Sequence, residues 1–453
     1  MKLLFKRSVV LFLLSSLLVF GIAAFIIQYL NHASAWVQHP TNKHLFNNGK
    51  LKASGSIYDR SGEILLEVKD GSTKFHQDKA VRTALMHAVG DLHNNVATGV
   101  KVAFGEHLIG WNLLNGVYRF RGKMGDSADL YLTLEGKLCA TAYKALNGRK
   151  GAVGVYNYQT GEILCMVSSP SFDPANPPNI EGSPEQYEGV YLNRFLSSVY
   201  PPGSIFKLVT AAAALDNLPG LESKLYHCEG KMKIGADMVT CLREHGSVTF
   251  EQALAHSCNV AFAQISLELG ASTLQKYANL AGFNSSLELD GIKTAIGKVN
   301  VINAADVELA WAGIGQYTNT ANPLNFMAFV GAIANNGVLI PPKLIAENNS
   351  FLSRIQKKQI LSAETAAKLK AMMRNNTKSV YGEHNFKNLE LCAKSGTAEV
   401  GQGKRPHAWF AGFLARDDYP LAFVVLIENG GSGSGAAAAV AGTVLQAAVS
   451  SGN

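Results

Sequence analysis

The sequence predicts an α+β fold in which an antiparallel sheet is covered by helices, preceded by one transmembrane helix and a small membrane-proximal domain. Three observations support this prediction. Strand-like patterns stand at both ends of residues 131–453, with helical patterns between them. Residues 8–30 carry no charged side chain. Of the 453 residues, 47% are hydrophobic and 17% are charged, which is enough apolar material for a sizeable core.

The uncharged run at residues 8–30 is long enough to cross a membrane, because roughly 20 apolar residues in a helix span the ~30 Å hydrocarbon core. The basic residues Lys2, Lys6 and Arg7 precede this run. The positive-inside rule therefore predicts a cytoplasmic tail at residues 1–7, a single span of the cell membrane, and a body that works outside the cytoplasm.

A cleaved signal peptide is the alternative, since Ala33-Ser34-Ala35 forms a small-residue cleavage pattern before Trp36. The apolar region of a signal peptide usually has about 7–15 residues. The apolar run in this chain is longer, so we favour the membrane anchor.

Residues 31–130 are predicted to form a linker and the membrane-proximal domain. Two short apolar runs flank Asp59-Arg60-Ser61-Gly62, which is the pattern of a β-hairpin. The catalytic domain is then expected at residues 131–453.

Within residues 131–453, a helical pattern at residues 135–146 stops at Asn147-Gly148. Residues 151–156 and 162–168 predict a hairpin with one buried face. Near the carboxyl end we expect three strands and a last helix, at residues 389–400, 407–415, 421–427 and 436–449.

The chain contains one Ser-x-x-Lys, from Ser204 to Lys207, directly after Pro201-Pro202-Gly203. Proline and glycine break the preceding structure and open a helix. Residues 208–215 are almost all apolar, which predicts a buried helix. Serine and lysine at i and i+3 share one helix face. A desolvated Lys207 is neutral and accepts the proton of Ser204, so the pair predicts a nucleophile with its base.

The second motif is Ser257-Cys258-Asn259, which follows a capping-box pattern at Thr249 and Gln252. We expect Ser257 to relay the proton between Lys207 and a leaving amine. Asn259 is expected to hydrogen-bond the substrate backbone and Lys207.

The third motif, Lys394-Ser395-Gly396-Thr397, opens an inner strand. Lys394, Ser395 and Thr397 are expected to bind a terminal carboxylate, and Gly396 to let the substrate approach the backbone. The N–H groups of Ser204 and Thr397 would form an oxyanion hole. Together the motifs predict serine acyl transfer to a peptide, and their order is that of penicillin-binding proteins and class A β-lactamases.

With these motifs in place, the chain resembles the class B penicillin-binding proteins, the bitopic peptidoglycan D,D-transpeptidases, over most of its length. Besides the three motifs, the segments that carry the resemblance are Asp59-Arg60-Ser61-Gly62, Leu132-Thr133-Leu134-Glu135, Thr160-Gly161-Glu162-Ile163, Ser168-Ser169-Pro170-Ser171-Phe172-Asp173-Pro174 and Trp409-Phe410-Ala411-Gly412.

Three positions depart from the family pattern. Ser395 stands where threonine is commoner, and it keeps the hydroxyl. Cys258 occupies the middle of the second motif, and we expect its side chain to point away from the cleft. Ala53-Ser54-Gly55 replaces an arginine-glycine pair, which puts contacts of the membrane-proximal segment in doubt.

The resemblance implies the penicillin-binding serine transpeptidase fold, with an all-helical subdomain beside the sheet. It implies that Ser204 attacks the carbonyl between two D-alanines of a stem pentapeptide on lipid II-derived strands, and that the amine of a neighbouring stem resolves the acyl-enzyme. β-Lactam antibiotics would acylate Ser204, and a polytopic glycosyltransferase that polymerises lipid II would be the partner. The chemistry requires no metal or organic cofactor. The net charge is +7, of which Lys2, Lys6 and Arg7 supply three, and the remaining +4 is too mild to argue for nucleic acid.

Two other classes of function stay open. The first is a hydrolase, a D,D-carboxypeptidase or a β-lactamase, although the membrane-proximal domain and the strand at Trp409 favour the synthase. The second is a binding module, such as a β-lactam sensor or a division scaffold. A sensor needs a cytoplasmic signalling part, and only residues 1–7 precede the membrane span.

The six cysteines at positions 139, 165, 228, 241, 258 and 392 fit neither a dense disulfide framework nor a zinc-ligand spacing well. Cys228 and Cys241 are expected to lie close together across a polar excursion that His227 and His245 flank. A surface loop of ordinary residues is the favoured interpretation, with a disulfide or a metal site as alternatives. Cys139, Cys165 and Cys392 lie in apolar stretches typical of small core residues.

Overall fold

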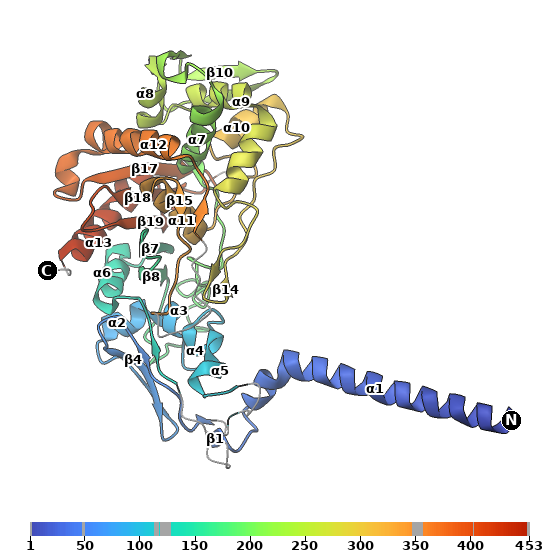
Figure 1. The fold of residues 1–453 in the computed structure, drawn as a ribbon. Coiled ribbons are helices and arrows are strands. Elements are labelled where there is room, and N and C mark those ends of the chain that lie inside the picture. Colours follow the sequence, from blue (N-terminus) through green and yellow to red (C-terminus); the bar gives the residue numbers. More distant parts are fainter. Residues whose placement is uncertain are drawn as a thin grey trace. The chain divides into compact units, whose positions relative to one another are not determined.

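The computed structural model describes residues 2–47, 50–112, 117, 128–346, 357–401 and 403–450 (Figure 1). Parts of the predicted ranges 1–7, 31–130 and 131–453 therefore lie outside the described residues. The chain forms two compact units. The first comprises Met1–Tyr58, Ile64–Phe75 and Phe104–Leu130, and the second comprises Asp59–Glu63, His76–Ala103 and Tyr131–Asn453.

The first unit is built on one long helix and several short strands. Its elements are α1 (Lys2–Val37), β1 (Phe46–Asn47), β2 (Lys50–Leu51), β3 (Ile57–Tyr58), β4 (Ile64–Lys69), β5 (Ser72–Phe75) and α5 (Gly105–Leu108). Strand β6 (Leu130–Tyr131) lies where the chain passes into the second unit.

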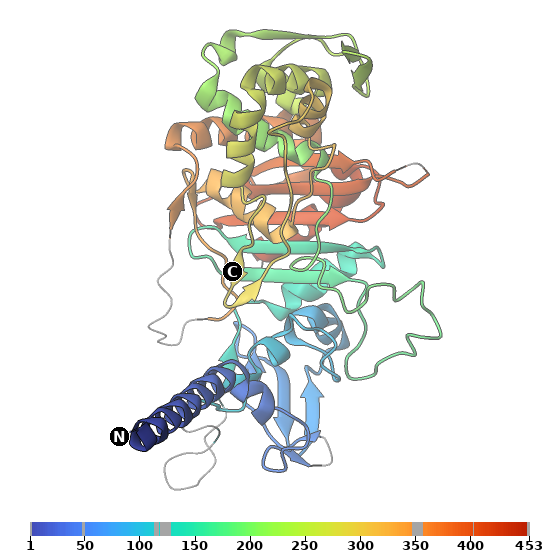
Figure 2. The same cartoon turned by 90° about the vertical axis from the view of Figure 1, so that its right-hand side faces the viewer.

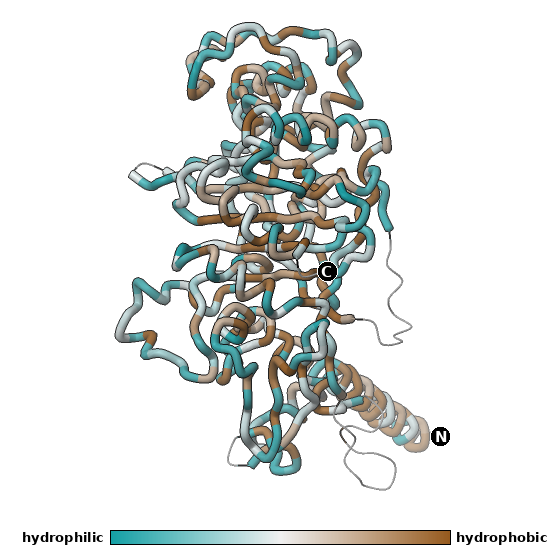
Figure 3. The backbone as a smooth tube through the Cα atoms, turned by 90° about the vertical axis from the view of Figure 1, so that its left-hand side faces the viewer, coloured by the Kyte–Doolittle hydropathy of each residue, from teal (hydrophilic) through white to brown (hydrophobic). Residues whose placement is uncertain are grey.

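Helix α1 has 36 residues, and the 31 residues from Leu3 to Ala33 are apolar enough to cross a membrane. Apart from Ala33, none of the described side chains in this stretch is buried, and Figure 3 shows the helix as predominantly hydrophobic. The helix extends beyond the predicted span of residues 8–30 at both ends. These properties are consistent with a single-pass membrane anchor.

The predicted hairpin around Asp59 is confirmed, because β3 and β4 pair antiparallel. The Asp59 carboxylate accepts the backbone N–H groups of Ser61 and Glu63, which holds the turn. Elsewhere in the first unit, Leu45, Ile109 and Val117 form an apolar cluster.

The second unit contains the main sheet and most of the helices. Its helices are α2 (Lys79–Ala84), α3 (Met86–Val89), α4 (Val100–Ala103), α6 (Gly136–Leu146), α7 (Lys207–Asn217), α8 (Phe250–Ala255), α9 (Asn259–Leu280), α10 (Asp306–Gly313), α11 (Pro323–Ala334), α12 (Ala363–Asn376) and α13 (Ala438–Ser450). Its short helical turns are η1 (Gly203–Phe206), η2 (Leu221–Ser223), η3 (Thr377–Tyr381), η4 (Glu383–Phe386) and η5 (Gly433–Ala437).

The main sheet has five antiparallel strands in the order β17-β18-β19-β7-β8, which lie side by side in Figure 2. Their bounds are β7 (Gly151–Asn157), β8 (Ile163–Ser169), β17 (Leu391–Ala398), β18 (His407–Leu414) and β19 (Leu421–Ile427). The three predicted carboxyl-terminal strands and the hairpin of β7 and β8 are thereby confirmed.

The prediction that this hairpin buries one face is wrong, because β7 is buried at six successive positions. Side chains alternate between the faces of a strand. On one face, Gly154 and Tyr156 lie against Met327 and Gly331 of α11. On the other face, Cys165, which pairs with Val155, lies against α6 through Cys139. Helices therefore cover both faces of the sheet.

The predominantly helical part of the second unit lies beside the exposed edge of β17. In Figure 1, α7 lies between the main sheet and helices α9 and α10. This part also carries strands β9 (Leu225–Cys228), β10 (Lys231–Ile234), β11 (Asp237–Thr240) and β12 (Gly246–Thr249) as two small sheets, and further pairs occur at β13 (Glu288–Leu289), β14 (Ile292–Lys293), β15 (Val338–Leu339) and β16 (Lys358–Gln359). The expected all-helical subdomain is thus helical with small hairpins inserted.

Contact between α11 and the sheet can be tested at Gly331. A Cβ at this position would lie 1.9 Å from the hydroxyl of Tyr156, so Gly331→Ala should lower the free energy of unfolding by about 1–3 kcal/mol. Gly442→Ala on α13 is the matched control, because its Cβ would meet nothing closer than 3.4 Å and alanine is the better helix former. The measurement is the midpoint of thermal unfolding of each variant in detergent, compared with that of the wild-type protein. An unchanged midpoint for Gly331→Ala would contradict this packing.

Candidate active site

Ser204 lies in the 3₁₀ turn η1, which leads directly into α7, beside the edge strand β17. Gly203 has a φ of +54°, and a Cβ there would lie 2.7 Å from Thr397 O. A Cβ on Gly396 would lie 2.8 Å from Pro202 O. Gly396, which we expected to make room for substrate, therefore makes room for the turn. The two glycines allow the close approach that sets Ser204 beside the third motif.

Lys207 is the first residue of α7, and its side chain is fully buried behind Ser204. The Nζ atom lies 3.2 Å from Ser204 Oγ, 2.6 Å from Ser257 O and 2.7 Å from Asn259 Oδ1. Burial lowers the pKa of Lys207 to about 7, because a low dielectric disfavours the ammonium form.

These contacts suit a neutral amine, which has two N–H donors and one lone pair. Two of the neighbours, Ser257 O and Asn259 Oδ1, are carbonyl oxygens that only accept. The amide nitrogen of Asn259 donates to Thr240 O at 2.8 Å, which turns its oxygen toward Lys207. If the two N–H groups go to these oxygens, the lone pair is left for a hydroxyl proton. Lys207 is therefore placed to take the proton of Ser204.

Ser257 lies in the turn between α8 and α9, with a φ of +55° that a serine seldom adopts. The predicted capping box at Thr249 and Gln252 is confirmed at the start of α8. The Ser257 Oγ atom lies 3.0 Å from the Nζ of Lys207 and 3.0 Å from the Nζ of Lys394. A hydroxyl has one proton to donate. By donating to one amine and accepting from the other, Ser257 connects the two lysines.

Lys394 is fully buried on β17, and its Nζ also donates to Ser395 O at 3.0 Å. Burial, with repulsion from Lys207, holds the pKa of Lys394 well below its ordinary value of 10.5. The Lys394 side chain contacts Ser257 Oγ and Ser395 O, so it lies behind the hydroxyl groups that line the cleft. The expectation that Lys394, Ser395 and Thr397 bind a carboxylate stays a prediction.

A cleft of about 440 Å³ opens over this arrangement. Predicted site residues that line it are Ser204, Ser257, Asn259, Ser395 and Thr397. The structure thus brings all three motifs together, although they are far apart in the chain. The cleft combines a half-buried hydroxyl backed by a buried amine with further hydroxyl groups along one strand, which is an arrangement suited to acyl transfer.

Tyr381 is a site residue that the sequence analysis missed. Its hydroxyl accepts the N–H of Ser395 at 2.9 Å and donates to Ser395 Oγ at 3.1 Å. The ring packs edge-on against Phe410. Tyr381 also lines the cleft and positions the third motif from η3. Its short turn carries no pattern that could have indicated this contact.

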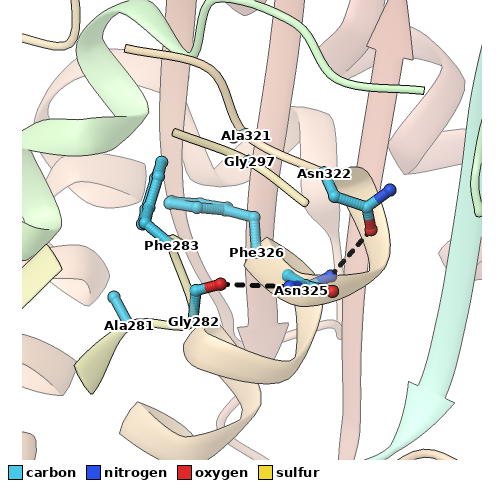
Figure 4. A pocket seen from close by; sticks show the side chains of 8 residues that line it. All are labelled: Ala281, Gly282, Phe283, Gly297, Ala321, Asn322, Asn325 and Phe326. Carbon is cyan, nitrogen blue, oxygen red and sulfur yellow. Dashed lines mark hydrogen bonds between the residues drawn. The ribbon is translucent and has the colours of Figure 1, made fainter. Parts of the chain in front are cut away.

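A second hollow, shown in Figure 4, is lined by residues that include Gly282, Phe283, Asn325 and Phe326. The hollow is too narrow to hold even a water molecule. Asn325 donates to Gly282 O at 3.1 Å, and the ring of Phe283 packs against Phe206 at a centroid distance of 5.2 Å. This hollow is therefore too small to hold a substrate, in contrast to the cleft over Ser204.

Comparisons with known proteins agree with this geometry. Residues 151–446 match the family model of the penicillin-binding protein transpeptidase domain. The chain is 31% identical over 339 residues to the peptidoglycan D,D-transpeptidase PbpA of Mycobacterium tuberculosis, covering 66% of this chain and 67% of that protein. It is 27% identical over 352 residues to the peptidoglycan D,D-transpeptidase MrdA of Acinetobacter baumannii, covering 68% of this chain and 52% of the relative.

Solved structures show the same fold. A D,D-transpeptidase domain from Eggerthella lenta superposes with a TM-score of 0.75 at 27% identity, covering 89% of this chain and 99% of that one. The penicillin G acyl-enzyme complex of penicillin-binding protein A from M. tuberculosis gives a TM-score of 0.75 at 25% identity, with 88% and 100% covered. Fold, family model and relatives agree: the chain belongs to the class B penicillin-binding proteins, the serine peptidoglycan D,D-transpeptidases.

Proposed function

We propose that this chain cross-links peptidoglycan stem peptides through an acyl-enzyme formed on Ser204. The observation that carries the proposal is the position of the buried Lys207 Nζ, 3.2 Å from Ser204 Oγ and 3.0 Å from Ser257 Oγ. A base with a pKa of about 7 is close to neutral pH, where general base catalysis is most effective.

In the first step, Ser204 Oγ attacks the carbonyl carbon between two D-alanines of a stem pentapeptide, and Lys207 takes the hydroxyl proton. The N–H groups of Ser204 and Thr397 stabilise the resulting oxyanion. As the tetrahedral intermediate collapses, the proton passes from Lys207 through Ser257 to the leaving D-alanine amine. The product is an ester between Ser204 and the shortened stem.

In the second step, the amine of a neighbouring stem attacks this ester. Its proton returns through the same groups to Ser204 Oγ, and the new amide is the cross-link. The substrate carboxylate is bound by Ser395 and Thr397, and Lys394 supports this strand from behind by donating to Ser395 O. Asn259 holds both the substrate backbone and Lys207.

β-Lactams acylate Ser204 by the same attack, which opens the lactam amide. Support comes from the M. tuberculosis relative, whose structures include penicillin G and imipenem acyl-enzymes. We further infer that α1 crosses the cell membrane with its amino end in the cytoplasm, and that a polytopic membrane glycosyltransferase supplies the lipid II-derived strands.

The first prediction concerns the chemistry. Ser204→Ala should abolish labelling by a fluorescent penicillin, and Lys207→Arg should slow labelling by about 10²–10⁴-fold, the usual contribution of a general base. A guanidinium stays protonated and cannot accept the serine proton. Stopped-time gel fluorescence measures the rate, and mass spectrometry locates the adduct.

Ser223→Ala and Lys224→Arg are the matched controls, since this neighbouring pair lies outside the cleft. Both should label at the wild-type rate. Incubation of a stem pentapeptide with a labelled D-amino acid then separates transferase from hydrolase, because a transpeptidase exchanges the amino acid into the peptide. Release of D-alanine without exchange would favour a carboxypeptidase, and an adduct on Ser204→Ala at another residue would overturn the assignment.

The second prediction concerns membrane topology. Alkaline phosphatase fused after Asn453 should be active, because Lys2, Lys6 and Arg7 hold the amino end of α1 in the cytoplasm. A fluorescent protein that matures only in the cytoplasm is the control fusion and should stay dark. The chain should also resist extraction by alkaline carbonate. A mature protein that begins at Trp36 would instead establish a cleaved signal peptide.

A further inference from the structure

Three cysteines and one histidine converge beside the active site. The Cys228 Sγ atom lies 3.6 Å from Cys241 Sγ and 3.5 Å from His245 Nδ1, and Cys241 Sγ lies 3.8 Å from Cys258 Sγ. All four donor atoms lie within 4.8 Å of one another. The expected proximity of Cys228 and Cys241 is confirmed, and each thiol is free.

Two small strand pairs, β9 with β12 and β10 with β11, assemble this cluster together with the amino end of α9. Cys228 ends β9, opposite Gly246 at the start of β12, and His245 immediately precedes that strand. Cys241 follows β11, and its N–H donates to Gly230 O at 2.8 Å. Cys258 caps the amino end of α9. Pairing of the strands therefore brings together residues that are 4 to 30 positions apart in the chain.

The spacing of the donors corresponds to the edges of a tetrahedron around a metal ion. With Zn–S bonds of about 2.3 Å and Zn–N bonds of about 2.0–2.1 Å, tetrahedral ligands have S···S edges of about 3.8 Å and S···N edges of about 3.5 Å. The three pairs with measured distances fall close to these values. A disulfide would join only two of the sulfurs, at about 2.05 Å, and would leave the third thiol and the imidazole unused.

We propose that Cys228, Cys241, Cys258 and the Nδ1 of His245 bind one Zn²⁺ ion, which fixes the turn that carries Ser257 and Asn259. Three thiolates and one imidazole form a typical closed structural zinc site, and soft sulfur ligands disfavour magnesium and calcium. The thiols lose their protons to solvent as the metal binds. The proposal departs from our expectation of no metal, because the ligands come from two strand pairs and the amino end of α9 rather than from one short motif.

Backbone N–H groups around the sulfurs support this assignment. Cys241 Sγ accepts the N–H of Asn259 at 3.1 Å and that of Val260 at 3.3 Å. Cys258 Sγ accepts the N–H of Ala261 at 3.4 Å. Hydrogen bonds of this kind stabilise metal-bound thiolates and orient them. The first turn of α9 is thus arranged as an outer shell around two of the proposed ligands.

The same contacts connect the metal to catalysis. Cys258 lies between Ser257 and Asn259, and both of these residues contact Lys207. Two of the four ligands are therefore connected to the second motif. Cys258 is part of this motif, and Cys241 Sγ accepts the N–H of Asn259. A bound ion would hold Ser257 in its unusual backbone conformation and keep Asn259 Oδ1 on Lys207. The Cys258 side chain lies on the metal side and contributes nothing to the lining of the cleft among the described residues.

The test measures metal directly. The full-length protein, purified in detergent without added metal or chelator, should contain about one zinc per chain by elemental mass spectrometry. After removal of the zinc, Co²⁺ added alone should give the visible bands of a tetrahedral ion and the near-ultraviolet bands of thiolate ligands. Removal should also slow penicillin labelling roughly tenfold or more, and Zn²⁺ should restore the rate.

His245→Asn and Cys228→Ser should each lose the zinc, whereas the matched controls His227→Asn and Cys139→Ser should retain it. The zinc content and the cobalt spectrum are measured on the wild-type protein, so they do not depend on whether a variant folds. They also do not depend on whether the chain is a transpeptidase. A protein that contains no zinc and gives no tetrahedral cobalt spectrum would overturn the proposal. Peptide mapping without reduction that finds Cys228 bonded to Cys241 would overturn it as well.

Discussion

The active site depends on one buried amine. Among the described residues, the partners of Lys207 Nζ are hydroxyl and carbonyl oxygens and not carboxylates. Burying an ammonium ion without a carboxylate costs several kcal/mol. Burial lowers the pKa of Lys207 to about 7, so the amine can avoid this cost by losing its proton. Two carbonyl oxygens, Ser257 O and Asn259 Oδ1, then hold the neutral amine in place. Its remaining lone pair faces the hydroxyl groups, so the arrangement that makes burial tolerable also makes the lysine a base.

A second buried lysine, Lys394, affects the protonation of Lys207. Lys394 shares the hydroxyl of Ser257 with Lys207, and two ammonium ions around one hydroxyl would repel each other. Protonation of one therefore favours the neutral form of the other. A proton taken from Ser204 can move along Lys207, Ser257 and Lys394 without leaving the buried network. Gly203 and Gly396 allow η1 and β17 to pack closely beside this network, and the proposed zinc site would fix the turn that carries Ser257.

Much of this could be predicted from the sequence, because the chemistry is local. Ser204 and Lys207 lie one helical turn apart, and apolar residues after Lys207 indicate its burial. Patterns of β-branched and aromatic residues predicted the three carboxyl-terminal strands correctly. The fold that joins these elements followed from resemblance to a family rather than from the patterns themselves.

The remaining features depend on packing between distant segments. Burial of β7 on both faces requires knowing that α6 and α11 lie on opposite sides of it. The hydroxyl of Tyr381 reaches Ser395 from a turn with no recognisable pattern. Likewise, Gly396 has no side chain that would collide with the carbonyl oxygen of Pro202. These two residues meet only because η1 packs against β17. The sequence indicated that Cys228 and Cys241 lie close together, but it did not indicate that Cys258 joins them, because packing of the strands against α9 sets that distance.

The pH dependence of acylation tests the role of Lys207 most directly. The rate constant for penicillin acylation, measured between about pH 5 and 9, should rise with pH and level off above about 7, because only the neutral amine accepts the serine proton. Asn259→Asp should move this limb to higher pH, since a carboxylate beside Nζ stabilises the ammonium form. A wild-type rate that is independent of pH over this range, or one that keeps rising toward the ordinary lysine pKa of 10.5, would contradict a buried neutral base.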